Sequence, residues 1–215
     1  MGRALLCLAV ASLACVPARA DTLGVDFTQA GTISNPSAAN LGWEFRVDTA
    51  VTVVGLGVWD AYAYTDGLAF AWPRDQHVGL WLETASGPQL LADTYVSTDD
   101  ALVGNWRFNS IAPITLAAGE TYVVGSQGGA AFTFDVNGFN PDPDIRYLGS
   151  RFVFVGDAST DRPLAYPTGA DGTVHGYLGG NVLFGDATVP EPSALLLLLA
   201  GAAVMAALRR AKSSS

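Results

Sequence analysis

The stretch Trp43-Glu44-Phe45-Arg46-Val47 decides the fold, because apolar and charged side chains alternate at every position along it. Successive side chains of a β-strand point to opposite faces of the sheet. The alternation therefore predicts a half-buried strand, with Trp43, Phe45 and Val47 facing a core and Glu44 and Arg46 facing solvent.

Further strand-like segments follow along the chain, separated by turns of glycine, proline and aspartate. Val51–Trp59 is a β-branched run in which Gly55 and Gly57 stand where a bulge or a close contact between sheets could form. Seven other segments are strand-like: residues 77–83, 90–96, 106–111, 122–126, 131–136, 151–155 and 182–184. No segment between them predicts a helix. About nine strands at this spacing predict an all-β fold, an antiparallel β-sandwich of the jelly-roll-like kind.

The C-terminal segment, residues 189–215, has a different texture from the strands. It begins with the motif Val189, Pro190, Glu191, Pro192 and Ser193. Each proline ring removes a backbone donor, and Pro192 pushes Glu191 toward an extended conformation, so a helix begins only after Pro192. The motif is therefore expected to stay accessible to the active site of another protein.

A single transmembrane helix is predicted over residues 193–208, which are uncharged. Sixteen residues span about 24 Å, somewhat short of a hydrocarbon core of about 30 Å, and such a span still inserts. Arg209, Arg210 and Lys212 follow it and are expected to stay cytoplasmic, which places the preceding chain outside the inner membrane. A simple membrane anchor and a buried core helix are the alternatives.

The motif, the short apolar run and the basic end together resemble the PEP-CTERM sorting signal of Gram-negative bacteria, in which Pro-Glu-Pro precedes a short membrane helix. Here Pro190-Glu191-Pro192 matches the core triplet. The resemblance covers residues 189 to about 212. It implies an exosortase as partner, transient anchoring in the inner membrane, and release to the cell surface or the extracellular polysaccharide matrix.

The N-terminal segment has the layout of a signal peptide, residues 1–20. Arg3 supplies a positive charge, residues 4–16 are apolar, and Ala18-Arg19-Ala20 carries the small residues that signal peptidase requires, so Asp21 is the expected mature N-terminus. Cys15 suggests a lipoprotein signal instead, but Ser12 stands where that motif has leucine. Because both cysteines of the chain lie in this segment, the domain predicted for residues 21–188 has no disulfide.

The predicted domain is strongly acidic. Five of the 11 lysines and arginines and one of the 20 acids lie in the end segments, which leaves six arginines, no lysine and 19 acids. This excess of negative charge repels phosphate backbones, so nucleic acid is not an expected partner.

Residues 41–126 resemble a bacterial domain family of unknown function that has a jelly-roll-like sandwich. The matching pieces, in order, are Leu41-Gly42 with Phe45, Val54-Gly55-Leu56, His77-Val78-Gly79-Leu80-Trp81, Leu90-Leu91-Ala92, Trp106 with Phe108, and Pro113 followed by Leu116-Ala117-Ala118-Gly119-Glu120-Thr121-Tyr122-Val123. Ala118-Gly119-Glu120 also predicts a tight turn on its own account. The resemblance implies the fold and leaves function open.

An aromatic insertion, residues 61–76, departs from regular strand texture and is a candidate site of carbohydrate contact. Its Tyr62, Tyr64 and Trp72 could form a stacking platform for the apolar faces of sugar rings. The alternative is that these aromatic side chains cover one end of the core, since aromatic residues contribute mainly through burial.

An acidic loop is a candidate calcium site. It carries Asn137, Asn140, Asp142 and Asp144, whose oxygen atoms are the ligands that Ca²⁺ prefers. The loop lacks the glutamate and the spacing of an EF-hand. A rigid, solvated turn is the favoured interpretation, because acidic loops are ordinary on an acidic surface.

Catalytic machinery is not expected in this chain. The two histidines, His77 and His175, lack metal-ligand spacing, and no Gly-x-Ser-x-Gly motif occurs. His77 is more consistent with a structural role. We therefore expect an exported, exosortase-sorted surface or matrix protein that is structural or adhesive and not an enzyme, with no resident cofactor. A carbohydrate-binding module that recognises extracellular polysaccharide is the alternative, and a secreted hydrolase ranks third.

Overall fold

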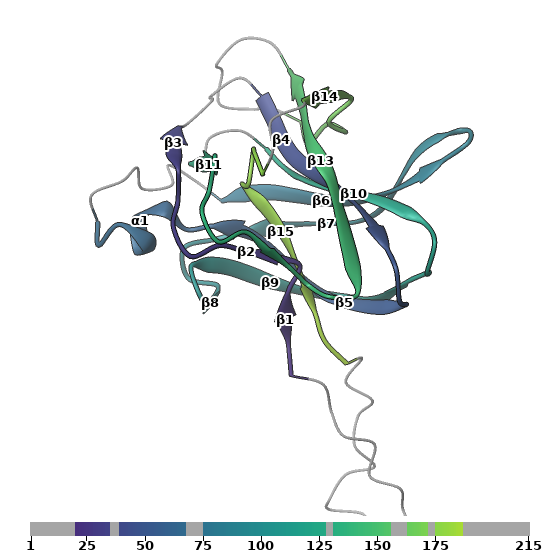
Figure 1. Ribbon diagram of the computed structural model, residues 1–215, viewed down its shortest axis with the longest axis horizontal. Coiled ribbons are helices and arrows are strands. Elements are labelled where there is room, and N and C mark those ends of the chain that lie inside the picture. The colour runs from purple at the N-terminus through teal and green to yellow at the C-terminus, as the bar shows by residue number, and fades with distance from the viewer. Residues whose placement is uncertain are drawn as a thin grey trace, which may run out of the picture.

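The computed structural model describes residues 20–34, 39–67, 75–127, 131–155, 163–171 and 175–186, and in this part of the chain the fold is all-β (Figure 1). The six-stranded sheet has the order β14 (Gly169–Asp171), β13 (Ile145–Phe154), β4 (Ala39–Val47), β10 (Thr121–Ser126), β6 (Gln76–Thr84) and β7 (Gly87–Val96). The five-stranded sheet has the order β1 (Thr22–Leu23), β15 (Gly180–Phe184), β5 (Val51–Trp59), β9 (Trp106–Leu116) and β8 (Ala101–Val103).

Two short strand pairs complete the described fold: β11 (Phe132–Phe134) pairs with β3 (Thr32–Ser34), and β12 (Asn140–Pro141) pairs with β2 (Val25–Asp26). Every strand pair is antiparallel, and the two large sheets form a sandwich-like arrangement. β1 and β15 bring the two ends of the described chain together, because Thr22 lies opposite Phe184.

The core between the two sheets is built on the stretch that alternates in the sequence. Trp43, Phe45 and Val47 of β4 are fully buried, and Glu44 and Arg46 lie on the other face, as predicted. The Trp43 indole also donates a hydrogen bond of 2.8 Å to the carbonyl oxygen of Gly180 in the opposite sheet. This bond satisfies the indole N–H where water is excluded and ties the two layers to each other.

The predicted bulge in Val51–Trp59 is also confirmed. The register between β5 and β9 shifts between Val53 and Gly55. At Gly57 a Cβ atom would lie 2.4 Å from the ring of Phe108, so this position admits glycine only while that ring stays in place. The close contact at Gly57 is therefore with an aromatic side chain of β9, the neighbouring strand of the same sheet, and not with the other sheet as the sequence suggested.

Several local expectations need correction. The chain does contain a helix, α1 (Ala61–Tyr64), which is a single turn capped by Asp60. β13 begins at Ile145 instead of residue 151, and β11 is shorter than the predicted segment 131–136. The short strands β1, β2, β3, β8, β12 and β14 were not predicted, because two or three residues carry no periodic pattern and depend on distant partners for pairing.

The two end segments lie outside the described residues. This holds for residues 1–19 of the predicted signal peptide, and for the motif Val189, Pro190, Glu191, Pro192 and Ser193 with the basic residues Arg209, Arg210 and Lys212. In the described part of the chain, no helix is both long and apolar enough to cross a membrane. The domain boundaries at residues 20 and 188 stay predictions.

Candidate functional site

A row of glycines crosses the outer face of the six-stranded sheet and leaves room for another segment of the chain. Gly125 of β10 lies opposite Gly42 of β4 on one side and opposite Gly79 of β6 on the other. These residues alternate with buried neighbours such as Val78 and Val124, so they belong to the face that points away from the core. The absence of side chains makes this part of the face flat.

Residues 163–167, which we call the strap, lie across this row. A Cβ atom on Gly79 would lie 2.8 Å from a methyl carbon of Leu164, and one on Gly125 would lie 3.3 Å from Pro167. Asn40 of β4 holds the strap by donating a hydrogen bond of 3.1 Å to the carbonyl oxygen of Ala165. The strap and the sheet are thus in van der Waals contact along the glycine row.

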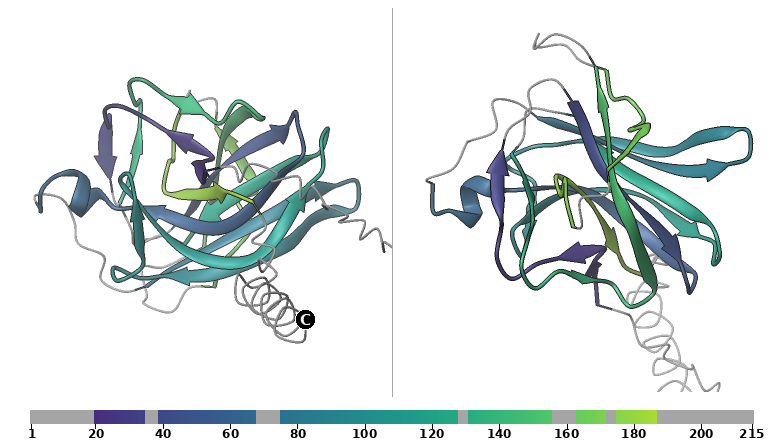
Figure 2. Two further views of the ribbon diagram at one scale, coloured as in Figure 1. Left: turned by 90° about the horizontal axis from the view of Figure 1, so that it is seen from below. Right: turned by 45° about the horizontal axis from the view of Figure 1, so that its top comes forward.

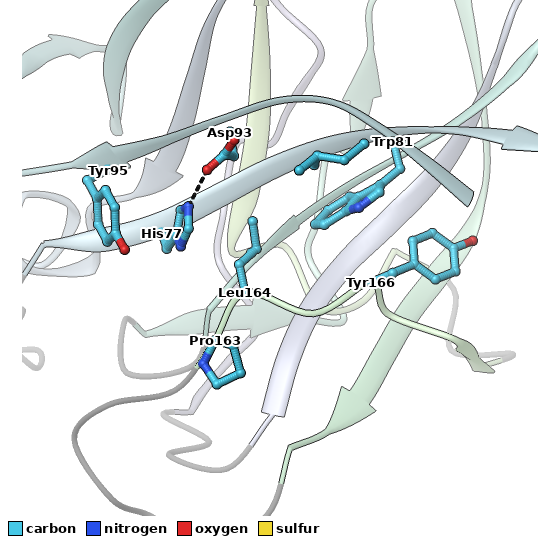
Figure 3. A pocket seen from close by; sticks show the side chains of 8 residues that line it. His77, Trp81, Asp93, Tyr95, Pro163, Leu164 and Tyr166 are labelled. Atoms are coloured by element: carbon cyan, nitrogen blue, oxygen red, sulfur yellow. Dashed lines mark hydrogen bonds and ion pairs between the residues drawn. The ribbon is translucent and has the colours of Figure 1, made fainter. Parts of the chain in front are cut away.

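A hollow of about 530 Å³ opens between the strap and the outer faces of β6 and β7 (Figure 3). Its lining residues are His77, Trp81, Leu90, Asp93, Tyr95, Pro163, Leu164 and Tyr166. Figure 3 shows Leu164 pointing from the strap toward the side chains of His77 and Trp81. Trp81 packs over Gly79, where a Cβ atom would lie 2.6 Å from its indole ring.

One wall of the hollow combines an ion pair with a ring stack. His77 Nε2 lies 2.7 Å from Asp93 Oδ2, and the His77 ring stacks on Tyr95 with the centroids 4.1 Å apart and the planes 17° apart. Tyr95 lies directly opposite His77 across the β6–β7 pair, which places both on the same face. The Tyr95 ring is nevertheless 57% exposed, so one ring face is braced while much of the ring meets solvent.

A polar network closes the other end of the strap. The Tyr166 hydroxyl donates a short hydrogen bond to Glu83, and Arg151 binds both Glu83, at 3.3 Å, and Glu44, at 2.7 Å. Burial raises the pKa of the Tyr166 hydroxyl above its ordinary value, and the hydrogen bond to Glu83 raises it further. Tyr166 is therefore a hydrogen-bond donor across the physiological range of pH.

A second tyrosine, Tyr177, is also held by a carboxylate. Tyr177 donates a hydrogen bond of 2.6 Å to Asp171, and this bond, with burial as the second cause, raises the pKa of Tyr177 to about 12. Its ring contacts Phe132 and Phe152, which belong to a small cluster at the end of the six-stranded sheet. Tyr177 is thus a structural link between β14 and this cluster.

The aromatic insertion lies at the opposite end of the sandwich from the β6–β7 turn (Figures 1 and 2). Tyr64 belongs mainly to the core: its ring contacts Phe27 and Trp59, and its hydroxyl accepts a hydrogen bond from the backbone N–H of Ala30. Tyr62 is 49% exposed. Trp72, the third predicted carbohydrate contact, lies outside the described residues. The structure thus leaves Tyr62 as the exposed one of the two described contacts.

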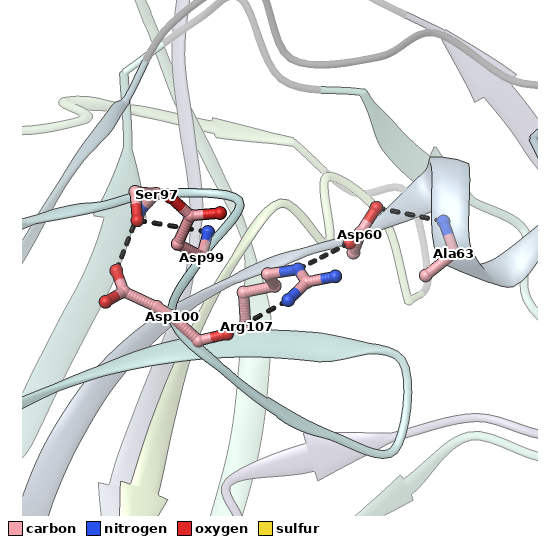
Figure 4. Close-up of polar contacts among 6 residues, drawn as sticks. All are labelled: Asp60, Ala63, Ser97, Asp99, Asp100 and Arg107. Atoms are coloured by element: carbon pink, nitrogen blue, oxygen red, sulfur yellow. Dashed lines mark hydrogen bonds and ion pairs between the residues drawn. The ribbon is translucent and has the colours of Figure 1, made fainter.

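The acid that precedes α1 is structural (Figure 4). Asp60 is buried, caps α1 by accepting a hydrogen bond from the N–H of Ala63, and pairs with Arg107 at 2.7 Å. Arg107 also donates to the carbonyl oxygen of Asp100. These bonds hold α1 against the turn between β7 and β8.

The acidic loop is engaged in the fold. Asn137 donates to the side chain of Gln29, and Asn140 lies opposite Asp26 in the β12–β2 pair. Asp142 is buried; it accepts a hydrogen bond of 2.7 Å from the Thr22 hydroxyl and another from the N–H of Asp144. The described residues contain no group of three or more His, Cys, Asp or Glu side chains that could hold a metal ion.

The described lining of the hollow provides the groups of a binding surface. It offers aromatic faces, apolar side chains and an exposed carboxylate, Asp93, beside an imidazole. Among the described residues that line it, there is no serine, threonine, cysteine or lysine beside the His77–Asp93 pair. Glu44 and Glu83, beyond the strap's Tyr166, are both bound to Arg151.

Comparisons with known proteins found no matching family model, no matching curated protein and no matching solved structure. The site therefore has to be judged from its own geometry.

From the sequence, the aromatic insertion and the acidic loop were the candidate sites, and the hollow beside the strap was not predicted. Along residues 77–83, Val78 and Leu80 alternate with His77 and Trp81, a pattern that predicts opposite faces of a strand, and the structure has Val78 and Leu80 in the core. The signal that could have found the site was the large outward aromatic residue, because a tryptophan on a solvent face needs a cover. Nothing in the sequence of the strap indicated that it supplies this cover.

Proposed function

We propose that this chain is an exported, exosortase-sorted protein of the cell surface or extracellular matrix, with a structural or adhesive role and no catalytic activity. One observation carries the proposal: Pro190-Glu191-Pro192, an uncharged run and the cluster Arg209, Arg210 and Lys212 follow one another in the order of a sorting signal. Signal peptidase and exosortase are its processing partners, and the inner membrane holds it until processing.

The all-β fold supports this role. Residues 20–186 have a substantial core without any disulfide, which suits a domain that must persist outside the cell on packing alone. The finer parts of the proposal are the signal peptide, the transmembrane helix over residues 193–208, and a jelly-roll-like relation to the domain family of unknown function.

Carbohydrate recognition is the second candidate function, and the hollow beside the strap favours it. Sugar-binding sites combine aromatic faces with side chains that accept hydrogen bonds from hydroxyl groups, and the hollow has both. A hydrolase ranks third, because Glu44 and Glu83, the pair of carboxylates linked to the strap through Tyr166, share Arg151 as their partner.

The test of the main proposal is intact mass of the protein recovered from membrane, supernatant and extracellular polymer of the native host, with and without exosortase. The expected species begins at Asp21, ends near Pro190, and occurs outside the membrane only when exosortase is present. A full-length C-terminus in the membrane under both conditions would reduce the tail to an anchor and overturn the sorting proposal.

A further inference from the structure

We propose that the strapped hollow is a binding site for a neutral sugar polymer, in which Tyr95 stacks on a sugar ring and Asp93 accepts hydrogen bonds from its hydroxyl groups. The choice of a polysaccharide rests on the proposed extracellular function. The site itself rests on four features of the described residues: shape, a braced aromatic ring, a fixed carboxylate and local charge.

The shape of the hollow fits part of a polymer chain. Its volume of about 530 Å³ lies within the range of about 300 to 1,000 Å³ that is typical of small-molecule sites. β6 and β7 supply the floor and one wall, and Leu164 and Pro163 of the strap supply the other wall (Figure 3). Because the strap is fixed by Asn40 and packs on Gly79, the hollow exists before a ligand arrives.

The aromatic surface has the right construction for stacking. The Tyr95 ring is stacked on His77, and His77 is in turn held by Asp93, so the orientation of the tyrosine is fixed without burying it. Leu90 lies on the same strand and is also exposed, which extends the apolar surface. A sugar ring presents C–H groups on one face, and these pack against an exposed aromatic face.

The polar groups of the hollow match hydroxyl groups. Asp93 binds His77 through one carboxylate oxygen, which leaves its second oxygen able to accept from a ligand. A pair of neighbouring hydroxyl groups on a sugar ring can donate to such a carboxylate while the ring rests on Tyr95. The imidazole of His77 keeps the carboxylate in a defined rotamer, which lowers the entropy cost of recognition.

Local charge selects against acidic polymers. Arg151, the arginine closest to the strap among the described contacts, is already bound to Glu44 and Glu83. Asp93 is half exposed at the mouth of the hollow. With a formal net charge of −9 on the whole chain, a uronic acid polymer would be repelled both locally and at long range. A neutral glycan is repelled neither by the carboxylate at the mouth of the hollow nor by the net charge of the chain.

The test is calorimetric titration of the full-length chain, solubilised in a detergent without a sugar headgroup, with oligosaccharide probes. The neutral probes are cellohexaose, laminarihexaose and mannohexaose, and the acidic probe is trigalacturonate. We expect at least one neutral probe to bind, and Tyr95→Ala to weaken that binding about tenfold or more, while Tyr95→Phe retains it. Asp93→Asn should weaken it as well, and Tyr62→Ala, on the aromatic insertion, is the matched control that should bind like the parent.

Three outcomes would overturn the assignment: no neutral probe binds at millimolar concentration, trigalacturonate binds as tightly as the best neutral probe, or Tyr62→Ala weakens binding as much as Tyr95→Ala. Near-ultraviolet circular dichroism of each variant separates loss of contact from loss of fold, and Asp93→Asn, a nearly isosteric change at an exposed position, provides the second variant. Binding without exosortase-dependent release would overturn the proposed sorting and leave the hollow assigned; release without binding would do the reverse.

Discussion

The strapped hollow and the aromatic insertion are both rich in aromatic and acidic residues, yet they present these side chains in opposite ways. In the insertion, Tyr64 packs against the core, and Asp60, the residue just before the insertion, is buried in a pair with Arg107. In the hollow, Tyr95 and Asp93 are exposed on one face of β7. Composition thus marks a region as unusual, but the face of the helix or strand on which a residue lies decides whether its side chain reaches solvent or the core.

The largest expected effect lies at the insertion end. Trp106→Ala removes a fully buried side chain that contacts Phe27 and lies opposite Trp59, so it should lower the free energy of unfolding by about 3 to 5 kcal/mol. Tyr62→Ala, at the same end but half exposed, should change it by no more than about 0.5 kcal/mol. Urea unfolding of both variants measures the contrast, and similar losses would show that Tyr62 is packed as tightly as the core residue Trp106.

The next effect concerns the buried acid. Asp60→Ala removes the cap of α1 and leaves Arg107 without its carboxylate partner, which should cost about 2 to 4 kcal/mol. Asp66→Asn, at an exposed position just after α1, is the control and should stay within about 0.5 kcal/mol of the parent. If Asp60→Ala changes the melting temperature as little as Asp66→Asn does, the ion pair with Arg107 contributes nothing to stability. The buried acid would then matter no more to the fold than the exposed acid of the hollow.

A smaller effect is expected at the glycine row. Gly79→Ala places a methyl group against Trp81 and Leu164, so it should cost about 1 to 3 kcal/mol and displace the strap. Gly149→Ala, on β13 of the same sheet, meets nothing closer than 4.0 Å and should be close to neutral. Unfolding free energies and the tryptophan fluorescence of the two variants test this, and an unperturbed Gly79→Ala would mean that the strap does not rest on the sheet.

The smallest effect is a dependence on alkaline pH. The pKa of Tyr166 is raised in the folded chain, so its hydrogen bond to Glu83 contributes stability that is complete below pH 10 and is lost as the pH rises through the folded-state pKa. Tyr166→Phe should flatten the fall in unfolding free energy above pH 10. An unchanged slope in the variant would assign the alkaline loss to other tyrosines, with Tyr177 as the first to examine.

The architecture was predictable from the sequence because long strands carry their own pattern. Trp43, Phe45 and Val47 alternate with charged residues, and this alternation gave both the strand and its buried face. The short strands were not predictable, since β1 pairs with β15 at the far end of the described chain. Their pairing depends on contacts that only the assembled sandwich provides.

The candidate site was predictable only in part. The pattern of residues 77–83 placed His77 and Trp81 on the outer face, but the partners of these residues come from β7 and from the strap. Asp93 contacts His77 because the β6–β7 register places the two residues diagonally across the strand pair. The sequence of one strand does not determine its register with another, so this contact could not be predicted. The aromatic insertion was predicted to contact carbohydrate because it is rich in aromatic residues, but its Tyr64 packs against the core.

The β1–β15 corner has a mechanical consequence. Any pull on the C-terminal side of the domain enters at Phe184, where β15 is bonded to β5 through five residue pairs. Hydrogen bonds of an antiparallel ladder stand perpendicular to the strands, so a load along β15 shears all five pairs together and cannot open them one at a time. The strap lies on the other sheet. A load that enters at this corner is therefore taken up by the five-stranded sheet and not by the walls of the hollow.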